Sequence, residues 1–158
     1  MSDIPSYFLK PGELFASKNP YKVKTLLGTC VSIVLYDQAL KIGGLNHFML
    51  PNGKPDRELP AKYATQAFSI LLKKMEELGS RKSTLKAKVF GGSDNTTFFS
   101  KTSFIGQRNV ETAIQLLEEA KIPVVAQNTG GNKGRKLLLV TSTGNVYMKF
   151  LQSSAKLL

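Results

Sequence analysis

The chain contains one cysteine, Cys30, and one histidine, His47, and together these side chains have the chemistry of a cysteine hydrolase. A free thiol has a pKa of about 8.5, and an imidazole that takes its proton leaves a strong thiolate nucleophile. The imidazolium can then protonate a departing nitrogen. A lone cysteine is more often a small buried apolar residue than a nucleophile, so the prediction requires that the fold bring the pair together.

The pattern of strand-forming residues offers a way for the pair to meet. Residues 31–36 are rich in β-branched and aromatic types, and residues 41–50 form a second strand-like run after a short turn. If residues 37–40 form the turn of an antiparallel hairpin, Tyr36 lies opposite Lys41. Cys30 then lies directly opposite His47, and both side chains point to the same face. Opposed residues have Cβ atoms roughly 4.5–5.5 Å apart, within reach of a sulfur–imidazole hydrogen bond. A single β-bulge would break this register.

Neighbouring residues could complete such a site. Gly28 allows a close backbone approach just before Cys30, and nearby amide groups could form an oxyanion hole. A third polar group commonly fixes the tautomer of a catalytic imidazole. The residues alone leave Thr25, Thr29 and Asn46 open as candidates for that third group.

The composition is that of a globular protein without a structural metal or a disulfide. The 158 residues, 42% hydrophobic and 21% charged, predict one domain over residues 1–158, with residues 1–10 and 152–158 at its periphery. One cysteine cannot form an internal disulfide, and one cysteine with one histidine is too few for a structural zinc site. The sequence shows no signal-peptide pattern and no apolar run of the roughly 18–20 residues that span a bilayer. We therefore expect a cytoplasmic protein with no metal and no cofactor.

The formal net charge of +11 predicts attraction to a polyanion or to an acidic protein surface. The basic residues are scattered along the chain, and no helix-turn-helix, zinc-finger or ribonucleoprotein motif accompanies them. Nucleic-acid binding is therefore an alternative with little specific support. It predicts a steeply salt-dependent affinity for DNA or RNA that does not depend on Cys30.

Hydrophobic periodicity predicts two helices among many short strands. Apolar residues recur at helical spacing after Pro60, up to a stop at Gly79, and again over residues 106–120. Strands are predicted over residues 13–17, 23–27, 31–36, 41–50, 85–90, 122–126, 136–141 and 145–151, the last two as a hairpin. The rest of residues 1–20 is expected to be irregular, and Phe98 with Phe99 to be a buried pair. This mixture predicts an α+β layered fold with a largely antiparallel sheet.

Six motifs carry a resemblance to a known family. They are LGTCVSI at 27–33, GGLNHFMLP at 43–51, KVFGG at 88–92, IGQRNV at 105–110, IPVVA at 122–126 and GGNKGRK at 130–136. Their order and identity resemble the CheD family, the chemoreceptor glutamine deamidases of bacterial and archaeal chemotaxis. The resemblance covers roughly residues 10–150. Two positions differ from the usual family residue, because Thr29 replaces a serine and Ser93 replaces an alanine.

The resemblance implies an enzyme that hydrolyses selected glutamine side-chain amides of chemoreceptor (methyl-accepting chemotaxis protein) cytoplasmic helices to glutamate, releasing ammonia without a cofactor. Members can also act on receptor methyl esters and bind the phosphatase CheC. The family's nucleophile maps to Cys30 and its histidine to His47. Its third catalytic residue, a threonine upstream of the Gly-x-Cys turn, maps to Thr25, with Lys24 as the competing position. The implied fold is a layered α/β/β sandwich resembling the catalytic domains of deamidating bacterial toxins.

The remaining motifs have structural interpretations beside functional ones. Residues 130–136 lack the strand, spacing and helix of a Walker phosphate loop, so we interpret them as a loop that enters a strand. Arg135 is nevertheless a candidate contact for acidic groups of a receptor. Gly28, Thr29 and Asn46 complete the candidate substrate-binding or oxyanion residues. The sequence leaves open which glutamines are used, whether methyl esters are hydrolysed, and whether a CheC partner exists.

Overall fold

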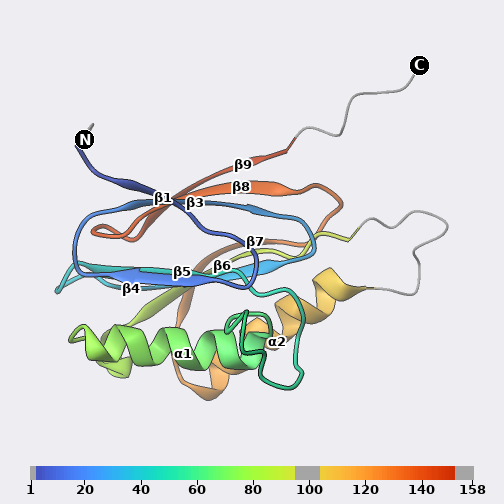
Figure 1. Ribbon diagram of the computed structural model, residues 1–158, viewed down its shortest axis with the longest axis horizontal. Coiled ribbons are helices and arrows are strands. Elements are labelled where there is room, and N and C mark those ends of the chain that lie inside the picture. The colour runs from blue at the N-terminus through green and yellow to red at the C-terminus, as the bar shows by residue number, and fades with distance from the viewer. Residues whose placement is uncertain (1–2, 95–103, 152–158) are drawn as a thin grey trace.

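The computed structural model describes residues 3–94 and 104–151, which form three layers (Figure 1). A four-stranded sheet forms one outer layer, a five-stranded sheet lies in the middle, and two helices cover the other side of the middle sheet. In chain order the elements are β1 (Ser6–Phe8), β2 (Leu14–Ser17), β3 (Lys22–Leu27), β4 (Val31–Asp37), β5 (Ile42–Asn46), α1 (Ala64–Glu77), a 3-10 turn (Lys82–Thr84), β6 (Lys86–Gly91), α2 (Ile105–Glu119), β7 (Val124–Thr129), β8 (Arg135–Val140) and β9 (Asn145–Phe150).

The sheets are mixed but mostly antiparallel. The outer sheet has the strand order β1-β3-β8-β9, and the middle sheet has the order β2-β5-β4-β6-β7. The β1–β3 and β6–β7 pairs are parallel, and the other five are antiparallel. The predicted α+β class, with α/β/β layers, two main helices and largely antiparallel sheets, is confirmed. The chain crosses from the outer sheet to the middle sheet through residues 28–30, between β3 and β4.

Two apolar cores hold the layers together, and β4 contributes to both because successive strand side chains point to opposite faces. Ile33 and Leu35 pack under the helices with Leu71, and all three are fully buried. Val34 points the other way and packs between the sheets with Leu137. Burial on both faces makes β4 a rigid support for the residue that precedes it, Cys30.

Most predicted elements lie where the sequence places them. The helix α1 ends just before Gly79, whose φ of +118° favours glycine, and α2 spans nearly the predicted range. Each of the eight predicted strands begins within two residues of its expected start. Hydrophobic periodicity therefore located these elements well.

The two ends of the site-bearing segment differ from the prediction. The sequence predicts that residues 1–10 lie at the periphery. In the structure β1 pairs with β3, and Leu9 is fully buried between the sheets. The sequence also predicts one strand over residues 41–50, but β5 ends at Asn46. There the side-chain oxygen of Asn46 accepts the hydrogen bond of the Ile33 N–H, at 2.9 Å. Isolated bridges at Phe48 and Leu50 continue the pairing beyond this point.

Residues 95–103 and 152–158 lie outside the described parts of the chain, and with them the predicted Phe98–Phe99 pair. Within residues 3–94 and 104–151, neither helix has the length and apolar character needed to cross a membrane.

Candidate active site

The turn that carries Cys30 is fixed through its carbonyl groups. The Gly28 carbonyl accepts a hydrogen bond from the Ser93 N–H at 3.0 Å, and the Cys30 carbonyl accepts one from the Gly92 N–H at 2.9 Å. Gly91 lies so close that a Cβ atom there would collide with the Cys30 carbonyl oxygen, and its φ is +107°. The double glycine after β6 therefore supports the turn, as the sequence suggested for a backbone turn near the site.

His47 is held by Thr25, which comes from the other sheet. The Thr25 Oγ1 lies 2.7 Å from the His47 Nδ1, and both side chains are buried. The same hydroxyl donates a hydrogen bond to the Leu9 carbonyl at 2.9 Å. A hydroxyl has one proton to donate, so toward His47 it can only accept. This arrangement assigns the proton to Nδ1 and leaves Nε2 as the basic nitrogen.

The geometry separates the two positions that competed for the third role. Thr25 lies on the inner face of β3 and contacts the histidine ring. The neighbouring Lys24 lies on the opposite face, because side chains alternate along a strand. It pairs with Leu138 in β8.

The predicted register of Cys30 against His47 is wrong by two residues. Tyr36 pairs with Gly43, and the bridge beyond the end of β5 joins Val31 to Phe48. Cys30 directly precedes Val31, and His47 directly precedes Phe48, so both side chains point to the same face. They are diagonal neighbours rather than opposed residues, and such neighbours are roughly 7–8 Å apart. Among the described residues no hydrogen bond joins the thiol to the ring. Cys30 and His47 therefore share a face as predicted, but they do not lie directly opposite each other.

Burial favours neutral forms of both groups. It lowers the pKa of the His47 ring from its usual 6.5 to about 4, and the nearby Glu13 carboxylate opposes this change only in part. Burial also raises the pKa of the Cys30 thiol, and its own backbone N–H beside the sulfur partly offsets the rise. At neutral pH the pair is a thiol and a neutral imidazole, not a preformed ion pair.

The mouth of the site lies at Gly28 and Thr29, which are both exposed. A Cβ atom added at Gly28 would meet no other atom within 4 Å, so nothing in the described protein crowds this position. Within those residues the amides of Thr29 and Cys30 donate to no backbone carbonyl. Both N–H groups lie in the turn that carries the sulfur, and the Cys30 N–H lies beside the sulfur itself, so this turn is the candidate oxyanion hole.

The other predicted residues are engaged in the fold. The Asn46 side chain is fully buried, and its oxygen accepts from Ile33, as described above. Arg135 is also buried and donates to the Asn128 side chain at 2.9 Å and to the Gly130 carbonyl at 2.8 Å. These bonds hold the 130–134 loop against the end of β7, and Phe150 covers the guanidinium at 5.2 Å.

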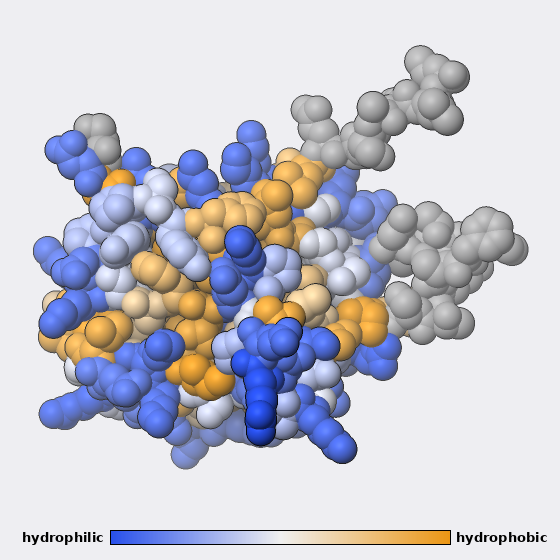
Figure 2. Space-filling model, viewed as in Figure 1, coloured by the Kyte–Doolittle hydropathy of each residue, from blue (hydrophilic) through white to orange (hydrophobic). Residues whose placement is uncertain are grey.

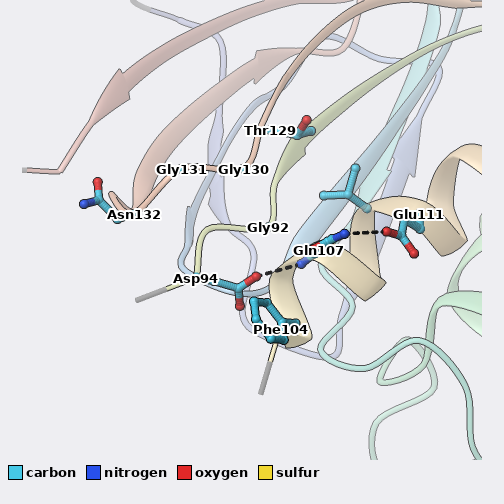
Figure 3. Close-up of a pocket in the computed structure, with 10 residues that line it drawn as sticks. Gly92, Asp94, Phe104, Gln107, Glu111, Thr129, Gly130, Gly131 and Asn132 are labelled. Carbon is cyan, nitrogen blue, oxygen red and sulfur yellow. Dashed lines mark hydrogen bonds between the residues drawn. The ribbon is translucent and has the colours of Figure 1, made fainter. Parts of the chain in front are cut away.

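A hollow of about 610 Å³ adjoins the Cys30 turn through Gly92 (Figure 3). Its walls are Gly92, Asp94, Phe104, Gln107, Val110, Glu111 and the loop residues Thr129, Gly130, Gly131 and Asn132. The Asp94 carboxylate accepts from the Gly106 and Gln107 amides at 2.8 and 2.9 Å, so the first amides of α2 are occupied. None of Thr25, Cys30 and His47 lines this hollow.

Known proteins with similar sequences bear out the family resemblance of the six sequence motifs. A family model described as CheD chemotactic sensory transduction matches residues 49–150. A relative from Clostridium botulinum strain Hall is 43% identical over 152 residues, which cover 93% of this chain and 94% of the relative. The chain belongs to the CheD family. A relative from Sulfurimonas denitrificans is 34% identical over 148 residues, covering 93% and 95% of the two chains. Both relatives carry the name "Probable chemoreceptor glutamine deamidase CheD".

Two solved structures share part of this arrangement. A Neisseria meningitidis protein of the DUF152 family has a TM-score of 0.47 at 8% identity, covering 82% of this chain and 65% of its own. The Bacillus licheniformis protein YfiH has the same TM-score at 13% identity, covering 75% and 51%. Neither similarity is close enough to support a functional argument.

Sequence reasoning missed one residue that contacts the backbone of the candidate site, Asn109 on α2. Its side-chain nitrogen donates to the Thr29 carbonyl and to the Met49 carbonyl, each at 3.0 Å. One fully buried side chain thus links the turn that carries Cys30 to the segment that follows His47. The available signal was a polar residue among the buried positions of α2.

We expect Asn109→Asp to lower kcat by about tenfold or more, because a carboxylate cannot donate to the two carbonyls and the turn loses its position. KM should change little, since Asn109 touches the backbone of the site and not the substrate. Steady-state ammonia release, measured where thermal melts show both proteins folded, checks the prediction. The exposed Gln115→Ala on the same helix is the control, and an unchanged kcat in Asn109→Asp would contradict the positioning role.

Proposed function

We propose that this protein is a protein-glutamine deamidase that converts selected glutamines in the cytoplasmic helices of chemoreceptors to glutamate and releases ammonia. The observation that carries the proposal is the buried Thr25–His47 hydrogen bond, on the same face as Cys30, with no partner for the basic ring nitrogen Nε2 among the described residues. The names of the CheD relatives support the substrate class. The proposed chemistry needs neither a metal nor a cofactor.

In the first half of the proposed reaction, a substrate glutamine enters past the exposed Gly28 and brings its amide carbon to the Cys30 sulfur. His47 Nε2 takes the thiol proton as the sulfur attacks, so the thiolate forms only in the presence of substrate. The carbonyl oxygen becomes an oxyanion that accepts hydrogen bonds from the Thr29 and Cys30 amides. The C–N bond then breaks, and the imidazolium gives its proton to the leaving nitrogen, which departs as ammonia.

In the second half, the glutamyl group is a thioester on Cys30. Neutral His47 takes a proton from a water molecule, whose oxygen attacks the thioester carbon. The C–S bond breaks, the proton on His47 returns to the sulfur, and the product is a glutamate side chain. Thr25 holds the ring through Nδ1 during both halves, so Nε2 stays aimed at the reacting atoms.

Replacing Thr25 with valine is expected to lower kcat by roughly 100-fold, because the isosteric side chain cannot accept a hydrogen bond from the Nδ1–H group and the imidazole loses its fixed tautomer. Thr25→Ser keeps the hydroxyl and should retain most of the activity. Steady-state ammonia release from both variants checks the prediction. Equal activities of the valine and serine variants would remove Thr25 from the mechanism.

Tandem mass spectrometry of a chemoreceptor cytoplasmic fragment tests the proposed function. Incubation with the wild-type protein should add about one mass unit at particular glutamines and release one ammonia for each conversion. A fragment that shows no such gain, with no ammonia released, would overturn the proposal. The same spectra report on receptor methyl esters, which offer the same acyl chemistry with methanol as the leaving group and which we include in the proposal.

The proposal also includes two predictions from the family resemblance. A CheC-type phosphatase is expected to bind this protein, and that binding should survive Cys30→Ala because it does not need the thiol. A cytoplasmic location is expected because the receptor helices to be modified lie there. A pull-down with purified CheC and the Cys30→Ala protein tests the first, and absence of binding would reject it.

A further inference from the structure

Among residues 3–94 and 104–151, no helix covers the outer face of the four-stranded sheet (Figure 1). Adjacent strands bring Leu26, Lys136 and Lys149 into one row and Lys24, Leu138 and Tyr147 into the next. We call these six residues the basic sheet face. They share this face because side chains alternate along a strand, and their neighbours Leu137 and Met148 belong to the core between the sheets.

The basic sheet face combines exposed apolar side chains with lysines. Leu26 is 44% exposed and Tyr147 is 61% exposed, and Lys136 and Lys149 are exposed beside them. A shallow hollow of about 260 Å³ lies over β8 and β9 and includes Lys136, Leu138, Tyr147 and Lys149 in its lining. In Figure 2 hydrophilic groups project from the upper layer, with hydrophobic surface between them. Exposed apolar surface bordered by polar residues is typical of a site that binds another protein.

The charges are divided between the layers. None of the residues in β1, β3, β8 and β9 is acidic, although Lys22, Lys24, Arg135, Lys136 and Lys149 are basic. The helices carry both signs of charge. Helix α1 has Glu76 and Glu77 beside Lys73 and Lys74, and α2 has three glutamates (Glu111, Glu118 and Glu119) and one arginine, Arg108. An acidic partner is therefore attracted more strongly to the outer sheet than to the helices.

The position of the basic sheet face connects it with the candidate active site. Leu26 precedes the exposed Gly28 by two residues. Lys136 lies directly opposite Leu26 in the β3–β8 pair. A protein segment that places one side chain at Cys30 and continues along the outer sheet therefore passes over this face. An anionic membrane would have no such connection to the thiol.

We propose that the basic sheet face binds an acidic amphipathic helix of the protein substrate, with glutamates against Lys136 and Lys149 and apolar side chains against Leu26, Leu138 and Tyr147. The inference rests on the proposed deamidase function and names the feature by which the enzyme selects its target. A glutamine followed or preceded along its helix by glutamates and leucines would be preferred over a glutamine in a basic or neutral segment.

Fluorescence anisotropy with the full-length Cys30→Ala protein tests the binding without turnover. The probe is a labelled synthetic helical peptide with one central glutamine, a glutamate face and leucines, and its matched peptide carries lysines in place of the glutamates. Lys136→Glu with Lys149→Glu should weaken binding of the acidic peptide by about tenfold at low salt. Lys73→Glu with Lys74→Glu, an equal charge change on the exposed side of α1, should leave it within about twofold.

Three results would overturn the proposal. The two double variants could weaken binding equally, which would reflect net charge alone. The lysine peptide could bind as well as the acidic one. The Lys136→Glu, Lys149→Glu protein could bind the peptide normally and lose only binding to phosphatidylserine vesicles, which would assign the face to a membrane. Failure of the deamidase proposal would be seen in a different measurement. In that case the wild-type protein would release no ammonia from the receptor fragment, whether or not the basic sheet face binds the peptide.

Discussion

Replacing Cys30 with alanine is expected to abolish ammonia release from chemoreceptor fragments, with a fall in kcat of at least about 1000-fold. The chain has no other cysteine that could take over the nucleophilic role. Without the sulfur no thioester forms, and hydrolysis would require direct attack by water on an amide, which His47 alone promotes poorly. A coupled assay of ammonia and mass spectrometry of the fragment measure the two products independently.

The control for Cys30→Ala is a thermal melt that shows whether the variant is folded. The cysteine is only partly buried at the edge of the core between the sheets, so its loss should lower the melting temperature slightly. Cys30→Ser keeps the shape of the side chain and should also be nearly inactive, because a hydroxyl is far harder to deprotonate than a thiol. Ammonia release by the folded Cys30→Ala protein at the wild-type rate would reject cysteine catalysis.

Replacing His47 with glutamine is expected to remove the general base and lower kcat by about 100- to 10,000-fold. The glutamine amide can still approach Thr25, so the local packing should persist. Activity of the wild-type protein should fall as the pH drops toward about 4, where the free imidazole becomes protonated and can no longer accept the thiol proton. A pH–rate profile of kcat/KM measures this limb, and an unchanged rate in His47→Gln would contradict the role.

The same substitution should flatten the pH dependence of stability. Because the pKa of His47 is about 4 in the folded chain and near 6.5 when unfolded, the unfolded chain binds more protons between these values. Stability is therefore full above pH 6.5 and falls as the pH drops toward 4, by about 3 kcal/mol in total. Urea unfolding across this window should show a smaller loss in His47→Gln than in wild type. Equal losses would show that His47 is not buried in its neutral form.

Much of the fold was predictable because local patterns determine it. The periodicity of α1 and α2 and the strand-rich runs around β3, β4, β8 and β9 located these elements closely. The pairing register was less accessible. The sequence suggests a hairpin that closes directly after Tyr36, whereas the structure pairs Tyr36 with Gly43 and moves Cys30 and His47 to diagonal positions. Hairpin register depends on the turn that the chain adopts, and a change of two residues preserves the face while changing the partner.

The site contains contacts between distant segments that local pattern cannot predict. Thr25 holds His47 from a different sheet, and its hydroxyl is oriented by Leu9, a residue in the segment expected at the periphery. Asn109 reaches the site from a helix that begins more than 70 residues after Cys30 in the sequence. The family resemblance proposed Thr25, which the structure places against the His47 ring, but it gave no reason to single out Asn109.

Trapping of the covalent intermediate tests the central claim most directly. Wild-type protein is mixed with a glutamine peptide of the receptor fragment, quenched rapidly in acid and analysed by intact-mass and peptide mass spectrometry. We expect an adduct equal to the peptide mass less one ammonia, located on the peptide that contains Cys30 and absent from Cys30→Ala. Formation of glutamate with no adduct at any quench time, or an adduct on another residue, would contradict the account.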